Sequence, residues 1–208
     1  MFIQLRRAQT SAVAVCVVDP EGEAKMNSIQ RFFLSAKHWQ IFLLIVGVCF
    51  VGQMTVVTSM ATQLLSADDF DRTARLFGVM TVVFMLFFLG WFWSMGSFLT
   101  SIIAEPQRLP IRYFRLALIY PAVYVAFFFT TFSASKPPSG LIVPFHLLAM
   151  FCMFYNLYFV SKSLVLAETG RAASFYDYAG PFFLTWFFPI GIWVVQPRIN
   201  RLFDRTLA

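Results

Sequence analysis

Charged residues are scarce in this chain. They make up 12% of its 208 residues, whereas roughly a quarter of the residues in soluble globular domains are charged. Hydrophobic residues reach 59%, and the 27 phenylalanines lie mostly in long uncharged runs. This much apolar surface needs lipid around it, so the composition excludes a soluble enzyme and indicates an α-helical membrane protein.

Sequence motifs of catalysis and metal binding are also missing. There is no His-Glu-x-x-His, no Gly-x-Ser-x-Gly and no phosphate-cradling loop, and the chain has only two histidines. Three cysteines, an odd number, indicate packing positions and no disulfide framework. The net charge of +6 comes from Lys and Arg beside the apolar runs, which argues against a nucleic-acid partner. We therefore expect no catalytic residue, cofactor or metal.

The N-terminal residues 1–25 are expected to be a disordered extension. Arg6 and Arg7 precede a short apolar stretch that superficially resembles a signal peptide, but it is too short and runs into Asp19. Met26 opens a segment typical of a cytoplasmic lead-in, so translation could start at Met1 or at Met26. N-terminal sequencing of native protein that begins at Met1 would exclude the later start.

Residues 26–208 are expected to form a single multipass membrane domain. Four apolar runs are each long enough to cross about 30 Å of hydrocarbon. The predicted spans are residues 41–65, 76–103, 116–132 and 141–166. Pro121 lies one turn inside the third span, where neighbouring helices can satisfy the carbonyl that it frees.

A further apolar segment, residues 180–197, is interrupted by Pro189 and Gly191. Its length is near the lower limit for a span, so it could be re-entrant, interfacial or a short fifth span. With four spans, thirteen of the 16 basic residues are cytoplasmic, and only Arg72, Arg75 and Lys136 lie outside. A fifth span would move Arg198, Arg201 and Arg205 outside and weaken the bias to ten against six. The positive-inside rule favours four spans with both termini in the cytoplasm.

Several residues are candidates for a functional role. Asp177 precedes the interrupted segment and could pair with Arg198 or Arg201, although simple solvation at the interface is the alternative. His146, together with Met150 and Met153 on one helix face and Asn156 nearby, has soft-metal ligand types. Ordinary apolar packing explains the same residues. Pro189 is a candidate because it interrupts the segment.

Small residues recur along one stripe of the second span, at Gly90, Ser94, Ser97 and Ser101. Such a stripe lets another helix approach closely. It predicts packing within the chain, a seam between copies of it or a polar path. The expected partners are the lipid bilayer and either further copies of the chain or another membrane protein.

Three stretches resemble a group of small bacterial multipass membrane proteins. They are Lys37-His38-Trp39-Gln40, the region from Phe145-His146-Leu147 to Phe154-Tyr155, and the ending Trp186-Phe187-Phe188-Pro189-Ile190-Gly191-Ile192-Trp193 to Gln196-Pro197-Arg198-Ile199-Asn200. The resemblance covers roughly residues 26–203. It implies a multipass fold in the bacterial inner membrane and implies no activity.

Three functions stay open at this point. The first is a non-enzymatic structural or interaction subunit. A solubilised protein that stays monomeric and recovers no partner would count against this function. The second is a small channel or transporter, although no charged residue lies deep in a span. The third is a membrane-embedded enzyme acting on lipid through His146, Asn156, Glu105 or Asp177, which would lose activity in His146→Ala and Asp177→Ala variants.

Overall fold

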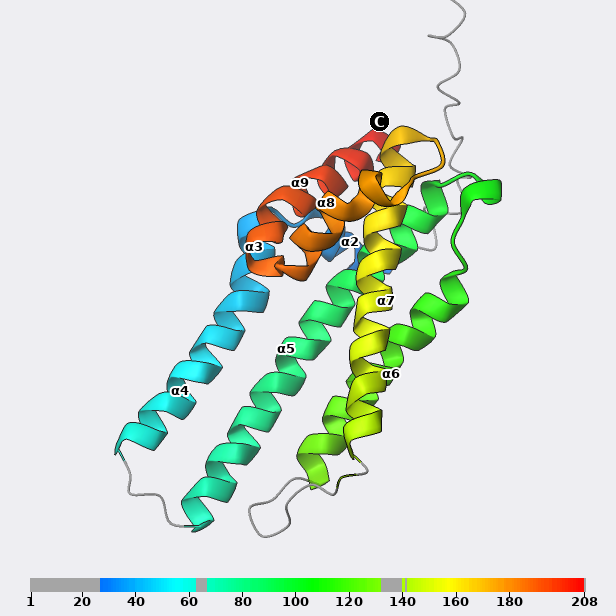
Figure 1. The fold of residues 1–208 in the computed structure, drawn as a ribbon. Helices are drawn as coiled ribbons and strands as arrows, with labels where there is room; N and C mark the ends of the chain where they lie inside the picture. Colours follow the sequence, from blue (N-terminus) through cyan, green and yellow to red (C-terminus); the bar gives the residue numbers. More distant parts are fainter. Residues whose placement is uncertain (1–26, 63–66, 132–139, 141, 208) are drawn as a thin grey trace, which may run out of the picture.

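The chain folds as a bundle of long helices. The structure is a computed structural model that describes residues 27–62, 67–131, 140 and 142–207 (Figure 1). Within these ranges there is no β-strand. Four helices are long and apolar enough to cross a membrane, namely His38–Thr58, Arg75–Ile102, Ile111–Phe129 and Ile142–Thr169. The expected helical fold with four candidate spans is confirmed, while the expectations for residues 1–25 fall outside the described ranges.

The first span is composed of three consecutive segments. Helix α2 (Ser28–Ser35) precedes it, and α3 (His38–Phe42) then continues through η1 into α4 (Val48–Thr62). The η1 segment is a single stretch of π-helix over Leu43–Gly47. A π-turn inserts an extra residue into the helical repeat and so rotates the faces on its two sides relative to each other. Nothing in the apolar pattern of this span predicted it.

Helices α5 (Ala67–Ile102), α6 (Ile111–Thr131) and α7 (Ile142–Thr169) form the centre of the bundle, with a 3₁₀ turn, η2, at Glu105–Gln107. The rings of Phe114 and Phe159 stack at 4.2 Å between centroids, and Asn156 Nδ2 donates to the carbonyl of Ala117 at 2.9 Å. These contacts place the start of α6 beside the C-terminal half of α7. Helix α6 begins five residues before the predicted span because Pro110, directly ahead of it, has no N–H to leave unsatisfied at a helix start.

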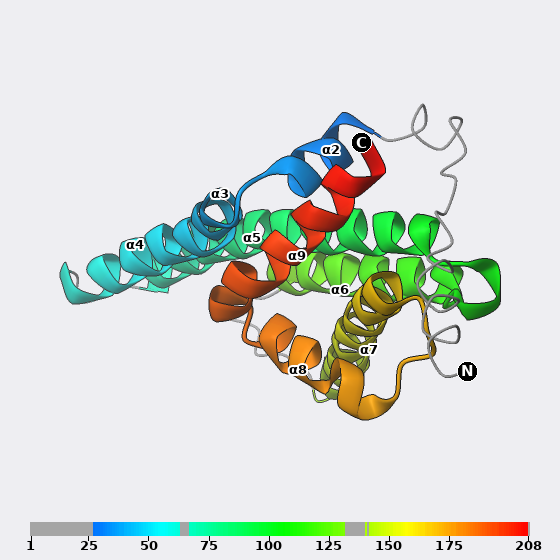
Figure 2. The ribbon, with the colours of Figure 1, turned by 90° about the horizontal axis from the view of Figure 1, so that it is seen from above.

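Helices α8 (Phe175–Trp186) and α9 (Phe188–Leu207) form a C-terminal helical hairpin. It lies at the end of the bundle that also carries α2, away from the α4–α5 connection (Figures 1 and 2). The chain turns at Phe187, where φ is −85° and ψ is 55°. The prediction put the interruption at Pro189 and Gly191, but both lie in the first turn of α9, where the missing N–H of a proline costs no hydrogen bond.

Gly191 allows the two arms of the hairpin to meet. An ideal Cβ at this position would overlap the backbone carbonyl of Leu184 on α8. A neighbouring main chain cannot move aside as a flexible side chain can, so only glycine fits here without displacing an arm. The glycine in the interrupted segment therefore serves close helix packing.

The hydrophobic core is concentrated at the hairpin end. Its largest fully buried side chains include Trp91 and Phe92 on α5, Leu164 on α7 and Ile192 and Ile199 on α9. The four candidate spans are only 17% to 28% buried within the molecule. The apolar residues along the rest of their length face outward, which is the pattern expected of helices that contact lipid.

The stripe of small residues on α5 is used partly inside the chain. A Cβ at Gly90 would lie 3.2 Å from the ring of Phe33 on α2, and Ser94 is 1% exposed. This half of the stripe supports packing of α2 against α5, the first of the two roles expected for it.

Candidate functional site

Gln196 is the polar centre of the hairpin's attachment to the bundle. Its side chain is fully buried, and its Oε1 accepts a hydrogen bond from Trp91 Nε1 at 2.8 Å. Its Nε2 donates to the carbonyl oxygens of Phe33 at 2.9 Å and Ala36 at 3.0 Å. One amide thus joins α9 to both α2 and α5.

These bonds satisfy backbone groups that a helix cannot satisfy itself. The last carbonyls of α2 have no intrahelical donor, and at a buried end they need one from elsewhere. Asn200, one turn after Gln196, also donates to the carbonyl of Ala36, at 3.1 Å. Neither amide was among the residues predicted from the sequence to have a functional role. The signal in the sequence that could have identified them is their spacing of four residues, which places both amides on one face of a helix in the C-terminal segment.

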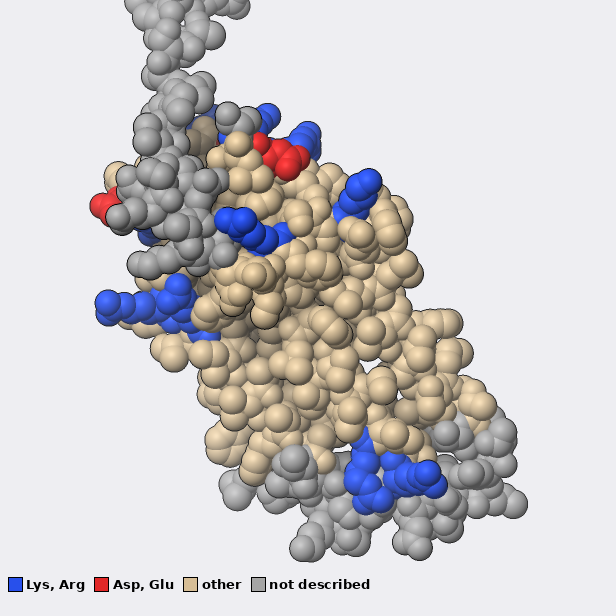
Figure 3. Space-filling model, turned by 180° about the vertical axis from the view of Figure 1, so that it is seen from behind, with Lys and Arg blue, Asp and Glu red and all other residues tan. Residues whose placement is uncertain are grey.

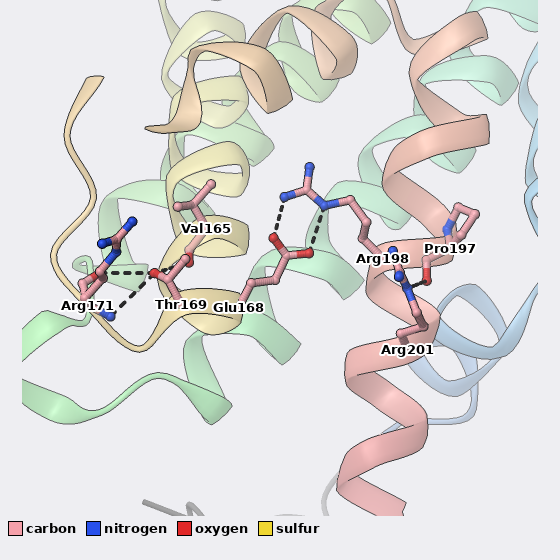
Figure 4. A network of polar contacts seen from close by, with 7 residues as sticks. All are labelled: Val165, Glu168, Thr169, Arg171, Pro197, Arg198 and Arg201. Atoms are coloured by element: carbon pink, nitrogen blue, oxygen red, sulfur yellow. Dashed lines mark hydrogen bonds and ion pairs between the residues drawn. The ribbon is translucent and has the colours of Figure 1, made fainter. Parts of the chain in front are cut away.

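An ion pair connects the hairpin to the end of α7. Arg198 Nε donates to Glu168 Oε1 at 2.8 Å, and its second nitrogen bonds Glu168 Oε2 (Figure 4). Both side chains are about a quarter exposed or less, at 21% and 27%. The geometry is bidentate, which is the stronger form of an arginine–carboxylate contact.

The expected pairing of Asp177 with Arg198 or Arg201 is wrong. Arg198 is taken by Glu168, and Arg201 Nε donates to the carbonyl of Pro197 at 3.3 Å (Figure 4). The reason is the path of the chain. Helix α9 returns to the level of the end of α7, where Glu168 lies, and Asp177 is held at the start of its own helix.

Asp177 instead completes the start of α8. Its carboxylate accepts hydrogen bonds from the hydroxyl and the backbone N–H of Ser174, both at 2.8 Å. These hydrogen bonds, with a smaller contribution from Arg171, lower the pKa of the Asp177 carboxyl. The carboxylate stands free of the bundle and stabilises a helix N-terminus, where negative charge is favourable.

The hairpin reaches deep into the bundle. The ring of Phe188 lies 5.1 Å from that of Phe88 and 5.9 Å from that of Phe84 on α5. On the other side, Trp186 lies 4.7 Å from Phe154 on α7. Further along α9, Phe203 contacts Phe98 at 5.5 Å. Helix α9 therefore rises beside α5 from the level of Phe88 towards the end of the span.

An apolar cavity, which we call the chamber, lies beside the turn of the hairpin. Its volume is about 370 Å³, and its walls come from α5, α6, α7, α8 and α9. The lining residues are Phe84, Met85, Phe88, Pro121, Tyr124, Val125, His146, Ala149, Met150, Met153, Phe154, Leu157, Thr185, Trp186 and Phe188. This size is within the usual range for small-molecule sites, which are mostly apolar with a few polar groups.

The polar residues that line the chamber include Tyr124, His146 and Thr185. His146 Nδ1 and the hydroxyl of Tyr124 lie 3.2 Å apart, and the hydroxyl of Thr185 donates to the carbonyl of Pro181 at 2.7 Å. His146, Met150 and Met153 do share the chamber, as their spacing predicted. The described residues hold no group of three or more His, Cys, Asp or Glu side chains that could bind a metal ion.

The remaining predicted residues lie elsewhere. Asn156 is fully buried between α7 and α6, with its Oδ1 lacking a partner among the described residues. Pro189 is exposed at the start of α9. The structure thus brings together His146 and the methionines, separates them from Asp177, and assigns Asn156 to packing between α6 and α7.

Among the described residues, charged side chains lie towards the two ends of the molecule. On the face in Figure 3, Lys and Arg gather near the end that carries the hairpin and again at the opposite end, with an uncharged belt between them. The described basic residues at the hairpin end are Arg31, Lys37, Arg108, Arg112, Arg115, Lys162, Arg171, Arg198, Arg201 and Arg205. At the opposite end the described ones are Arg72 and Arg75.

Comparison of the chain with protein-family models, with curated proteins and with solved structures finds no match.

Proposed function

We propose that the protein binds a small, largely apolar molecule in the chamber, at the middle depth of a bilayer, beneath a re-entrant C-terminal hairpin. The observation that carries this proposal is the chamber itself, whose walls come from five helices and meet at the turn of the hairpin. A concave apolar cavity with a few convergent polar groups is the usual form of a ligand site. Release of such a ligand to one side of the membrane would make the protein a small transporter.

The depth of the hairpin supports a re-entrant path. Phe88, opposite Phe188, is near the middle of the span Arg75–Ile102. At about 1.5 Å per residue it is roughly 20 Å from either end. The hairpin enters beside the end of α7 and returns to it at the Arg198–Glu168 pair. Backbone at such a depth needs its polar groups satisfied within the protein. At the turn, the N–H of Phe187 donates to the carbonyl of Phe183, and the N–H groups of Ile190 and Gly191 donate to the carbonyl of Phe187.

The distribution of charge supports an orientation with both termini in the cytoplasm. Described basic residues are far more numerous at the hairpin end than at the opposite end, and short cytoplasmic segments are enriched in Lys and Arg. Together with the resemblance to small bacterial multipass proteins, this favours the bacterial inner membrane. The interaction-subunit role expected from the sequence stays a prediction, since no described contact tests it.

Cysteine labelling in a variant without native cysteines tests the path of the hairpin. In intact cells and in inverted vesicles, a membrane-impermeant maleimide should leave Ile190→Cys unlabelled from both faces, because the turn lies within the bilayer. Arg205→Cys should react from the cytoplasmic face only. Reaction of Ile190→Cys from the cytoplasm would mean an interfacial hairpin, and reaction of Arg205→Cys from outside would mean an odd number of crossings.

Occupation of the chamber can be measured with a neutral tricyclic fluorophore such as aminoanthracene. The purified protein should bind the fluorophore saturably, and Ala149→Phe, which adds a ring inside the chamber, should weaken binding at least about tenfold. Cys152→Phe is the matched control, because it adds the same ring to the same helix outside the chamber. Equal binding by Ala149→Phe and wild type would exclude the chamber as the site.

A further inference from the structure

A second apolar cavity runs along the outside of α6 and α7, and we call it the outer groove. Its volume is about 670 Å³. Leu116, Ile119 and Val123 line it from α6, and Leu148 and Phe151 line it from α7. These side chains are about half exposed or more. Both helices are candidate spans, so the outer groove opens towards the acyl chains of a bilayer.

One end of the outer groove is rimmed by phenols. Tyr113 and Tyr155 line the groove at the end nearest the start of α6, close to the level fixed by the stacked rings of Phe114 and Phe159. Tyrosine is typical of the boundary between hydrocarbon and headgroups, where its ring is in the apolar region and its hydroxyl meets polar groups.

Two basic residues lie just beyond this rim. Arg112 precedes Leu116 by four residues, so it continues the groove-lining stripe of α6 by one turn. Lys162 is three residues beyond Phe159 on α7, at the corresponding level. Its Nζ donates to the hydroxyl of Tyr158 at 3.0 Å, and the Tyr158 ring lies 6.2 Å from that of Tyr155. Both cations are therefore close to the polar end of the outer groove.

Two other basic residues at this end of the molecule have a carboxylate partner. Arg198 is paired with Glu168, and Arg108 lies 3.8 Å from Glu105. Within the part of the chain that the structure describes, neither Arg112 nor Lys162 has such a partner. A cation at the membrane boundary next to an apolar groove is complementary to an anionic headgroup attached to a hydrocarbon chain.

We propose that the outer groove binds an anionic phospholipid. One acyl chain lies along α6 and α7, and the phosphate lies between Arg112 and Lys162, with the tyrosine hydroxyls at the level of the glycerol. The division of this surface into a long apolar part and a cationic end matches the division of a lipid molecule. The site is separate from the chamber, because the two cavities share no lining residue.

Native mass spectrometry of the full chain, released from detergent in the presence of one added lipid, tests this proposal. The probes are phosphatidylglycerol and phosphatidylcholine with identical acyl chains. We expect the wild-type protein to retain phosphatidylglycerol preferentially. The double variant Arg112→Gln/Lys162→Gln should bind it roughly thirtyfold more weakly, because each basic residue near a headgroup contributes on the order of 1 kcal/mol.

Three further variants make the result specific. Arg201→Gln/Arg205→Gln removes the same charge from exposed positions on α9 and should retain phosphatidylglycerol as the wild type does. Cys152→Phe fills the outer groove and should weaken both lipids, while Ala149→Phe should weaken neither. Equal retention of the two lipids by the wild type, or an equal loss in both double variants, would overturn the proposal.

Discussion

Gln196→Leu should lower the free energy of unfolding by about 3–5 kcal/mol. The leucine keeps approximately the volume of the side chain but removes three hydrogen bonds, those from Trp91 and to the carbonyls of Phe33 and Ala36. Each buried group left without a partner costs roughly 1–3 kcal/mol. Ala36 keeps its bond from Asn200, so we expect the loss to come mainly from Trp91 and Phe33.

Unfolding in mixed micelles of increasing denaturing-detergent content, followed by tryptophan fluorescence, measures this effect. The matched control is Gln53→Leu, an exposed amide on α4, whose replacement should change the free energy of unfolding by less than about 0.5 kcal/mol. If Gln196→Leu unfolds together with the wild type, Gln196 does not hold α2, α5 and α9 together.

Gly191→Ala should cost about 3 kcal/mol, near the upper end of the usual range for overpacking. The added methyl group would occupy the position of the Leu184 carbonyl, and relief requires the arms of the hairpin to separate. Separated arms would no longer hold the turn at the depth of Phe88, so the variant Ile190→Cys/Gly191→Ala should gain reactivity towards the impermeant maleimide. The same micelle titration and labelling measure the two effects.

Gly180→Ala is the internal control for this substitution. It lies on α8 with no atom within 4 Å of an added Cβ, and alanine is a better helix former than glycine by up to about 1 kcal/mol. We therefore expect unchanged or slightly higher stability and no labelling of Ile190→Cys. A similar loss in both variants would mean that the effect of Gly191→Ala is not caused by the contact with Leu184.

The candidate site was only partly accessible from the sequence. The spacing of His146, Met150 and Met153 on one helix face correctly put them together, because a helical repeat is local. The ion pair suggested between Asp177 and Arg198 or Arg201, with solvation of Asp177 as its alternative, is not formed. The choice between Asp177 and Glu168 depends on how far the hairpin descends before it returns. Gln196 was missed because its partners lie 105 to 163 residues away in sequence.

By itself, the sequence determined that the chain is helical, that it carries four apolar helices long enough to cross a membrane, and that its basic residues flank them. These properties depend on runs of neighbouring residues, because length and hydropathy along one helix decide whether it can span a bilayer. The tertiary structure alone decided where the C-terminal segment turns, how deep it reaches and which groups hold it. Those features depend on contacts between distant helices, such as the bonds of Gln196 and the approach of Gly191 to Leu184, and no local pattern encodes them.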